Sequence, residues 1–196
     1  VGMHGLYESN MAMHDCDLLI AVGARFDDRV TGRLDAFSPN ARKIHIDIDA
    51  SSINKNVRVD LPIVADAGKA LTGLLDGWRG KGLKSDARAI DMWWKVINKW
   101  REKDCLAYDG SGPVIKPQLA LERLQAAMEA TGKEYFVTTE VGQHQMWAAQ
   151  YLRFDAPNHW MTSGGLGTMG YGLPAATGVQ VAHPDALVVD VSGEAS

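Results

Sequence analysis

Residues 17–23, DLLIAVG, form a short apolar run that ends in glycine, and this is the pattern of a buried strand. A second run, residues 43–49 (KIHIDID), alternates apolar and polar side chains, and residues 61–66 (LPIVAD) are a third candidate strand. Residues 49–52 offer helix-capping side chains, and residues 69–75 have helical apolar spacing. Strands that alternate with helices predict an α/β fold, in which helices cover a parallel sheet.

The same alternation returns in the second half of the chain. Residues 134–139 and 187–191 indicate strands, whereas residues 142–150 and 174–181 indicate helices. Pro117 is well placed to begin a further helix, because proline is favoured at the first helical position. We therefore predict a second α/β unit.

A change in composition indicates a boundary between the two units. Glycines recur among basic and polar residues after residue 77, and an amphipathic, tryptophan-rich helix is predicted from residue 90. We predict a first domain at residues 1–78, a linker at 79–89 and a second domain at 90–196. The tryptophans are interpreted as packing residues rather than as a ligand platform.

Composition excludes several classes of protein. The 196 residues carry a net charge of −4, with 46% hydrophobic and 22% charged residues, so neither a nucleic-acid partner nor a membrane partner is expected. The apolar runs are too short for a membrane-spanning helix. Two cysteines without metal-type spacing favour a reducing, cytoplasmic setting. Both ends look abrupt, and we expect a piece of a longer protein.

A glycine-rich stretch carries the strongest functional signal. Five glycines fall within residues 164–172, and a predicted strand at 186–191 is followed by GEAS at 193–196. Glycines let backbone N–H groups approach phosphate oxygens, and a divalent cation prefers a carboxylate such as Glu194 nearby. This pattern suits a diphosphate with its metal, although a flexible turn is the alternative.

Residues 141–147, VGQHQMW, follow another predicted strand. Ligands in open α/β sheets lie at the carboxyl ends of strands, so Gln143 and His144 are candidate donors to phosphate. The alternative is that His144 is a surface helix residue. No nucleophile with a histidine and an acid can be assigned, and the histidines at 14, 45, 159 and 183 are interpreted as structural or surface residues.

A second polar cluster follows the first strand. Residues 25–29 contain two arginines and two aspartates, which form either a solvated loop or a site for an anionic ligand. Asp47 and Asp66 end the next two predicted strands, where an acid often meets a ribose hydroxyl. The pattern therefore predicts a nucleotide-type ligand.

Four sequence stretches resemble the catalytic large subunit of the acetolactate synthase (acetohydroxyacid synthase) family. They are residues 2–5 (GMHG), 22–32 (VGARFDDRVTG), 141–147 (VGQHQMW) and 164–174 (GGLGTMGYGLP). The resemblance extends over essentially the whole chain. It implies parts of two Rossmann-like domains of thiamine-diphosphate enzymes, the second half of the FAD-binding domain and the first part of the thiamine-diphosphate domain.

The resemblance implies an enzyme that decarboxylates pyruvate on thiamine diphosphate. The two-carbon unit is then condensed with a second 2-keto acid, pyruvate or 2-ketobutyrate, in branched-chain amino-acid biosynthesis. The implied cofactors are thiamine diphosphate, Mg²⁺ and FAD, and FAD takes no net redox part. The implied partners are a second copy of the large subunit, since the family forms homo-oligomers, and a regulatory small subunit. The resemblance favours bacterial cytoplasm, with a plastid as the alternative.

Site residues follow from the same motifs. The residues expected to border FAD are Met3, His4, Gly23, Ala24, Arg25, Asp27, Arg29 and Val30, with Asp47 and Asp66 at its adenosine side. The residues expected around thiamine diphosphate are Val141, Gly142, Gln143, His144, Gly167, Met169, Gly193, Ala195 and Ser196. Arg29 would also hold the carboxylate of the second keto acid, and Met169 would hold the thiamine in its bent shape, so these two are the expected catalytic residues.

The sequence departs from the family at the metal motif. Where the family has Gly-Asp-Gly-Ser or Gly-Asp-Ala-Ser, this chain has Glu194, whose extra methylene moves the carboxylate by roughly a bond length. The glutamate that activates the thiamine ring and the second metal ligand, an asparagine, are not among these residues. We therefore expect the chain to be inactive alone.

Two other functions stay open. One is a noncatalytic binding module that retains the cofactor surfaces. The other is a different FAD-containing carboligase, such as glyoxylate carboligase, which would turn over glyoxylate rather than pyruvate.

Overall fold

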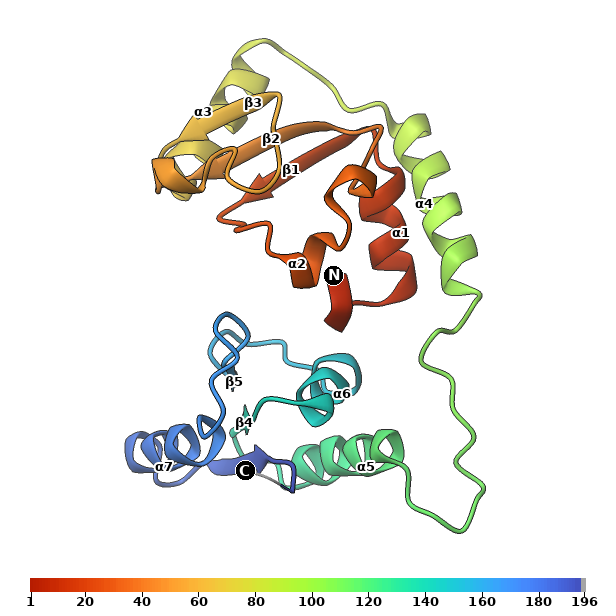
Figure 1. Ribbon diagram of the computed structural model, residues 1–196, viewed down its shortest axis with the longest axis vertical. Helices are drawn as coiled ribbons and strands as arrows, with labels where there is room; N and C mark the ends of the chain where they lie inside the picture. Colours follow the sequence, from red (N-terminus) through yellow and green to blue (C-terminus); the bar gives the residue numbers. More distant parts are fainter. Residues whose placement is uncertain (195–196) are drawn as a thin grey trace. The chain divides into compact units, whose positions relative to one another are not determined.

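The computed structural model describes residues 1–194, and the chain divides into two compact units, Val1–Cys105 and Leu106–Ser196. Each unit contains a three-stranded parallel sheet with helices around it, as the alternation of strands and helices predicts (Figure 1). None of the helices in the described part of the chain is both long enough and apolar enough to cross a membrane.

The sheet of the first unit has the order β1-β2-β3. Its strands are β1 (Leu18–Val22), β2 (Arg42–Asp47) and β3 (Leu61–Val64), close to the predicted runs. All three are parallel, with Val22 opposite Ile46 and Asp47 opposite Val64. The carboxyl ends of the strands therefore share one edge of the sheet, from which the loops carrying the polar residues leave.

Four α-helices belong to the first unit: α1 (Tyr7–Asp15), α2 (Asp28–Thr31), α3 (Ala67–Gly80) and α4 (Ala87–Arg101). Short 3-10 turns occupy Gly2–His4, Leu34–Ala36 and Ala50–Ser52. Helices α3 and α4 begin where the carboxylates of Asp66 and Asp86 accept backbone N–H groups of the first turn. The core of the unit contains Ala21, Phe26, Phe37 and Val57.

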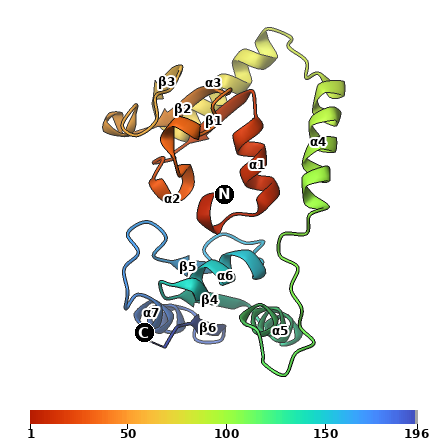
Figure 2. The ribbon, with the colours of Figure 1, turned by 45° about the vertical axis from the view of Figure 1, so that its right-hand side comes forward.

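The division between the units differs from the predicted one. Helix α3 continues to Gly80, so it overlaps the predicted linker at 79–89. Helix α4 was expected to open the second domain, but it lies beside α1 in the first unit (Figures 1 and 2). An amphipathic pattern gives a helix an apolar face without specifying its partner. Trp93 and Trp100 pack edge to face on this helix, with ring centroids 5.7 Å apart.

The sheet of the second unit has the order β5-β4-β6. Its strands are β4 (Tyr135–Thr139), β5 (Trp160–Thr162) and β6 (Leu187–Val191), and its helices are α5 (Pro117–Ala130), α6 (Gln143–Tyr151) and α7 (Gly172–Ala182). Pro117 begins α5 as predicted. The core contains Leu121, Met128, Val137, Ala148 and Leu152.

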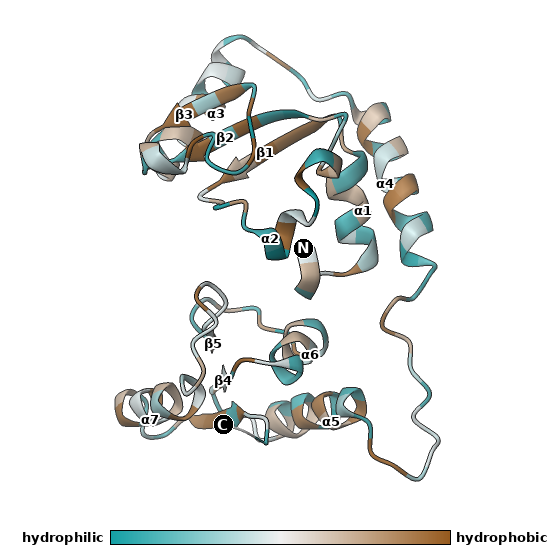
Figure 3. Ribbon diagram, in the orientation of Figure 1, coloured by the Kyte–Doolittle hydropathy of each residue, from teal (hydrophilic) through white to brown (hydrophobic). Residues whose placement is uncertain are grey.

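Strand β4 is the centre of this second sheet. From Phe136 to Thr139 it is buried, and it pairs with both β5 and β6. Strand β1 of the first unit is hydrophobic along its length (Figure 3), yet Leu18, Ile20 and Val22 on one of its faces are exposed. The two sheets thus bury their apolar residues to different extents.

Candidate functional site

A cavity of about 420 Å³ lies at the carboxyl edge of the second sheet. Three segments that are far apart in the sequence line it: the loop after β4 with the start of α6, the glycine-rich turn, and the loop after β6. The lining residues are Val141, Gly142, Gln143, His144, Trp147, Met169, Ser192, Gly193 and Glu194. The sequence predicted a ligand at the ends of these strands, and the structure brings the segments together.

The pairing of β4 with β6 explains why these segments meet. Thr139 is opposite Val191 in the parallel register, so the residues that follow the two strands leave the sheet side by side. His144 lies between them. A Cβ atom on Gly142 would lie 2.8 Å from Cε1 of His144, and one on Gly193 would lie 2.9 Å from the same atom. Both positions therefore need glycine to leave room for the imidazole ring.

The imidazole of His144 has an unused hydrogen-bonding atom at this cavity. Its Nε2 is buried and has no hydrogen-bond partner in the described part of the chain. A buried polar atom without a partner is costly, so a polar ligand in the cavity would relieve that cost. Gln143, which begins α6, is exposed beside it.

The glycine-rich turn brings Met169 to the same cavity. Gly167 and Gly170 have φ angles of 63° and 83°, which side-chain-bearing residues rarely adopt. The Met169 side chain is 64% exposed. Gly167 does not line the cavity, but a Cβ on it would lie 3.9 Å from Val141. The predicted residues Ala195 and Ser196 lie outside the described residues.

One acidic residue at this edge is absent from the sequence-based prediction. Glu140 follows β4 directly and is only 2% exposed. Its carboxylate accepts the N–H groups of Gly170, at 2.7 Å, and of Gly172. The bond from Gly172 is the main cause that lowers the pKa of Glu140 below its usual range, and burial opposes it. The available signal was an acid after a buried strand.

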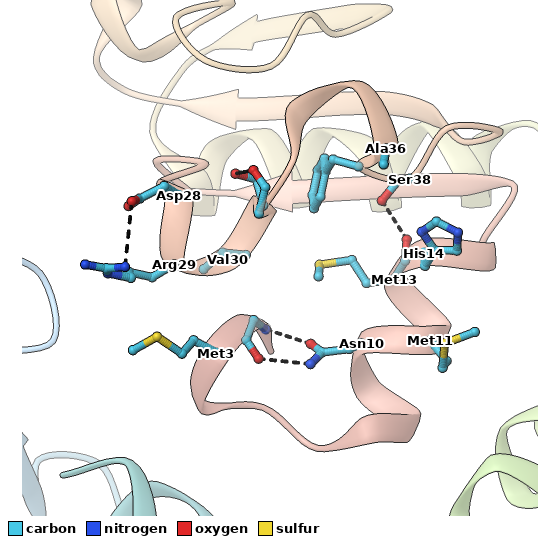
Figure 4. A pocket seen from close by; sticks show the side chains of 14 residues that line it. Met3, Asn10, Met11, Met13, His14, Asp28, Arg29, Val30, Ala36 and Ser38 are labelled. Carbon is cyan, nitrogen blue, oxygen red and sulfur yellow. Dashed lines mark hydrogen bonds and ion pairs between the residues drawn. The ribbon is translucent and has the colours of Figure 1, made fainter. Parts of the chain in front are cut away.

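The first unit has a cavity of about 480 Å³ near its N-terminal segment (Figure 4). Met3, Arg29 and Val30, three of the residues predicted to border FAD, line it together with residues of α1 such as Asn10. The Asn10 side chain exchanges two hydrogen bonds with the backbone of Gly2, at 2.7 and 2.9 Å. The N-terminal turn is thereby fixed against α1.

The other predicted residues of the first unit do not line this cavity. Gly23, Ala24, Arg25 and Asp27 lie on the loop after β1, where Arg25 forms an ion pair with Asp27 at 2.7 Å. Arg29 Nη1 is 3.9 Å from the Asp28 carboxylate, and the Arg29 side chain is 67% exposed. Burial lowers the pKa of His4, and the positive charge of Arg29 adds to this effect.

The two strand-end aspartates have local structural roles. Asp66 accepts the N–H of Lys69 at 3.0 Å and so caps α3, while Asp47 accepts the N–H of Asp49 at 2.8 Å. His45, interpreted above as a structural or surface residue, is fully buried. Its Nε2 lies 3.7 Å from the Asp47 carboxylate, and its ring packs against Phe26.

Among residues 1–194, no group of three or more histidine, cysteine, aspartate or glutamate side chains is placed to hold a metal ion. Glu194 is the acidic residue among those that line the second-unit cavity. A magnesium ion there would need further oxygen ligands, which phosphate groups commonly supply.

Comparison with known proteins identifies both units. Residues 1–74 match the central domain of thiamine pyrophosphate enzymes, and residues 140–196 match their C-terminal TPP binding domain. The chain belongs to the thiamine pyrophosphate enzymes. All residues that line the second-unit cavity lie within the match to the TPP binding domain of these enzymes. All residues that line the first-unit cavity lie within the match to their central domain.

Particular thiamine pyrophosphate enzymes are similar over all 196 residues. The acetolactate synthase large subunit of Haemophilus influenzae is 49% identical, the isozyme 3 large subunit of Escherichia coli 48%, and the large subunit of Porphyra purpurea 47%. The match includes 100% of this chain in each case, but 34%, 34% and 32% of the relatives. The chain therefore spans about a third of the length of these relatives, and the predicted resemblance is confirmed.

Proposed function

We propose that this chain is part of an acetolactate synthase large subunit. The enzyme decarboxylates pyruvate and condenses the two-carbon unit with a second pyruvate or with 2-ketobutyrate. The observation that carries the proposal is the second-unit cavity, where the segments at residues 141–144, Met169 and 193–194 meet. Whole-chain identity of 47–49% to acetolactate synthase large subunits supports it.

We propose that the second-unit cavity holds thiamine diphosphate. When bound, this cofactor supplies an electron sink for the negative charge that decarboxylation leaves behind. The unpartnered Nε2 of His144 and the glycines on either side of its ring fit a diphosphate. Gln143 and His144 would bind its oxygens, and Met169 would hold the thiamine in its bent shape.

We propose that Glu194 holds Mg²⁺ together with the diphosphate oxygens. Its carboxylate borders the cavity, and magnesium is usually held by one or two carboxylates plus substrate phosphates. Ala195 and Ser196 belong to the same proposed cofactor site by their place in the motif.

In the first unit we propose FAD as the ligand of the loops after the strands. Met3, Arg29 and Val30 border the cavity near the N-terminal segment, and the strand-end carboxylates of Asp47 and Asp66 suit the adenosine part. The exposed guanidinium of Arg29 is the proposed partner for the carboxylate of the second keto acid. His4, Gly23, Ala24, Arg25 and Asp27 complete this proposed site.

The proposed setting is the cytoplasm, which the two free cysteines, Cys16 and Cys105, suit. The proposed assembly is a homo-oligomer of large subunits with a regulatory small subunit, since the relatives carry the name "large subunit".

The test is product formation by a protein of the relatives' length that includes this chain. With thiamine diphosphate, Mg²⁺ and FAD, we expect it to form acetolactate from pyruvate. Turnover of glyoxylate in place of pyruvate would show a different carboligase. Binding of thiamine diphosphate without turnover of either acid would show a noncatalytic module, and both results would overturn the proposal.

A further inference from the structure

We propose that Glu140 is a positioning residue that holds the glycine-rich turn, residues 164–172, in the shape that presents Met169 to the second-unit cavity. The identity of the ligand in that cavity, thiamine diphosphate, is taken from the proposed function. The placement of the turn by Glu140 rests on the contacts alone.

The Glu140 carboxylate uses both of its oxygens on the same turn. One oxygen accepts the N–H of Gly170 at 2.7 Å, and the other accepts the N–H of Gly172. Glu140 itself is fixed because it follows β4, and its own N–H donates to Val191 on β6 at 3.1 Å. A rigid sheet edge is thereby joined to a turn that contains five glycines.

The turn is held on both sides of Met169. Before it, the N–H of Thr168 donates to the Ser163 hydroxyl at 2.8 Å. After it, the N–H of Gly170 donates to Glu140. Glycine leaves the backbone dihedral angles of the turn almost unrestricted. The side chains of Ser163 and Glu140, one on each side of Met169, restrict the backbone instead.

The electrostatics favour an ionised carboxylate at this place. Gly172 begins α7, an 11-residue helix, and the first N–H groups of a helix attract negative charge. Burial of Glu140 disfavours its charge, but hydrogen bonds from backbone N–H groups compensate. The lowered pKa of Glu140 agrees with this arrangement.

A second carboxylate limits Gly172 from the other side. The Asp190 carboxylate on β6 accepts a hydrogen bond from the hydroxyl of Thr138, at 2.9 Å, and another from the hydroxyl of Ser192. A Cβ on Gly172 would overlap the Asp190 carboxylate and would lie 3.0 Å from the backbone nitrogen of Glu140. The start of α7 is therefore held between the ends of β4 and β6, which fixes the C-terminal end of the turn.

The test uses a protein of the relatives' length in three forms: wild type, Glu140→Gln and Glu140→Asp. The matched control is Glu134→Gln, the same change at the opposite end of β4 in an exposed side chain. The dissociation constant for thiamine diphosphate is measured with Mg²⁺ from tryptophan fluorescence, because Trp147 borders the cavity. Amide hydrogen exchange at Gly170 and Gly172 is measured without ligand.

We expect Glu140→Gln to weaken thiamine diphosphate binding by roughly 10- to 100-fold, because a charge-assisted hydrogen bond to a buried carboxylate is lost. Exchange at Gly170 and Gly172 should accelerate. Glu140→Asp should recover part of the affinity, and Glu134→Gln should leave both measurements unchanged. A Glu140→Gln protein with wild-type affinity and exchange would overturn the proposal, as would a Glu140→Asp protein no better than Glu140→Gln.

A further variant covers the case in which Glu140→Gln does not fold. Ser163→Ala removes the other anchor of Met169, and we expect it to weaken thiamine diphosphate binding while exchange at Gly172 stays slow. Wild-type affinity in Ser163→Ala would count against the anchoring role of the turn. If the wild type bound no thiamine diphosphate, the proposed function would fail, whereas exchange at Gly170 and Gly172 would still decide whether Glu140 holds the turn.

Discussion

Single residues at the strand ends shape the second-unit cavity. Gly142 and Gly193 leave room for the His144 ring, and its Nε2 has no partner in the described residues. His144 was a candidate from its place after a strand, whereas Gly142 and Gly193 were expected from the family resemblance. The sequence did not predict Glu140, because an acid after a buried strand does not reveal that its carboxylate binds backbone N–H groups thirty residues later.

Glu194→Asp should tighten magnesium-dependent binding of thiamine diphosphate. Mg²⁺ requires near-ideal octahedral geometry, and the shorter side chain removes a methylene between the backbone and the carboxylate. The measurement is the dissociation constant for thiamine diphosphate over a range of Mg²⁺ concentrations, in a protein of the relatives' length. Equal Mg²⁺ dependence in both proteins would contradict the expectation.

Arg29→Ala should impair use of the second keto acid more than decarboxylation. The guanidinium is 67% exposed and lies 3.9 Å from the Asp28 carboxylate, so it has room to pair with a substrate carboxylate. We expect the KM for the second keto acid to rise by at least about tenfold, the effect of losing a charged hydrogen bond. Carbon dioxide release from pyruvate is the comparison, and equal losses in both steps would refute the role. Arg33→Ala, whose guanidinium is paired with Asp35 on the surface, is the control.

The secondary-structure elements show which sequence patterns were sufficient to predict a strand or a helix. Strands β1, β2, β3, β4 and β6 coincide with predicted apolar runs, because each combines several apolar residues with a turn residue. Strand β5 was not predicted, since Trp160–Thr162 is too short to show a period. Gly77 and Gly80 indicated a linker but lie within α3, which begins at the Asp66 cap and continues through both residues despite the low helix propensity of glycine.

The start of α7 should become less stable in acid because of Glu140. Its folded-state pKa lies below the unfolded value near 4.5, so its contribution to stability is complete above that pH and is lost as the pH falls through the folded-state value. The neighbouring titratable groups are Asp190 and His144. We expect the difference in urea midpoint between wild type and Glu140→Gln to be large at neutral pH and to narrow below about pH 4.5. A difference independent of pH would argue against an ionised Glu140.

At the level of the whole molecule, the chain consists of two α/β units rather than the predicted domains at 1–78 and 90–196 joined by a linker. Helix α4 belongs to the first unit because it packs on α1, and that pairing is tertiary information that its own sequence does not carry. The fold class, in contrast, follows from the alternation of strands and helices.

Limited proteolysis should cut near the start of the second unit, at residues 109–115, which are exposed and lie outside any helix or strand. We expect an N-terminal fragment that retains α4, identified by mass, with a protease of broad specificity at low concentration. A first cut confined to residues 79–89 would instead support the predicted linker. Helix α3 continues to Gly80, so the first residues of that segment should resist cleavage.

The strand order β5-β4-β6 also has a consequence for synthesis on the ribosome. Strand β4 is made before both of its neighbours, and β6 arrives only after the intervening turn and α7. The roughly fifty residues between Thr139 and Leu187 take about 2–10 s to translate. During that time the edge of β4 that pairs with β6 has no partner strand in the nascent chain. A chaperone that shields open strand edges during translation would therefore have a binding site at β4 during this interval.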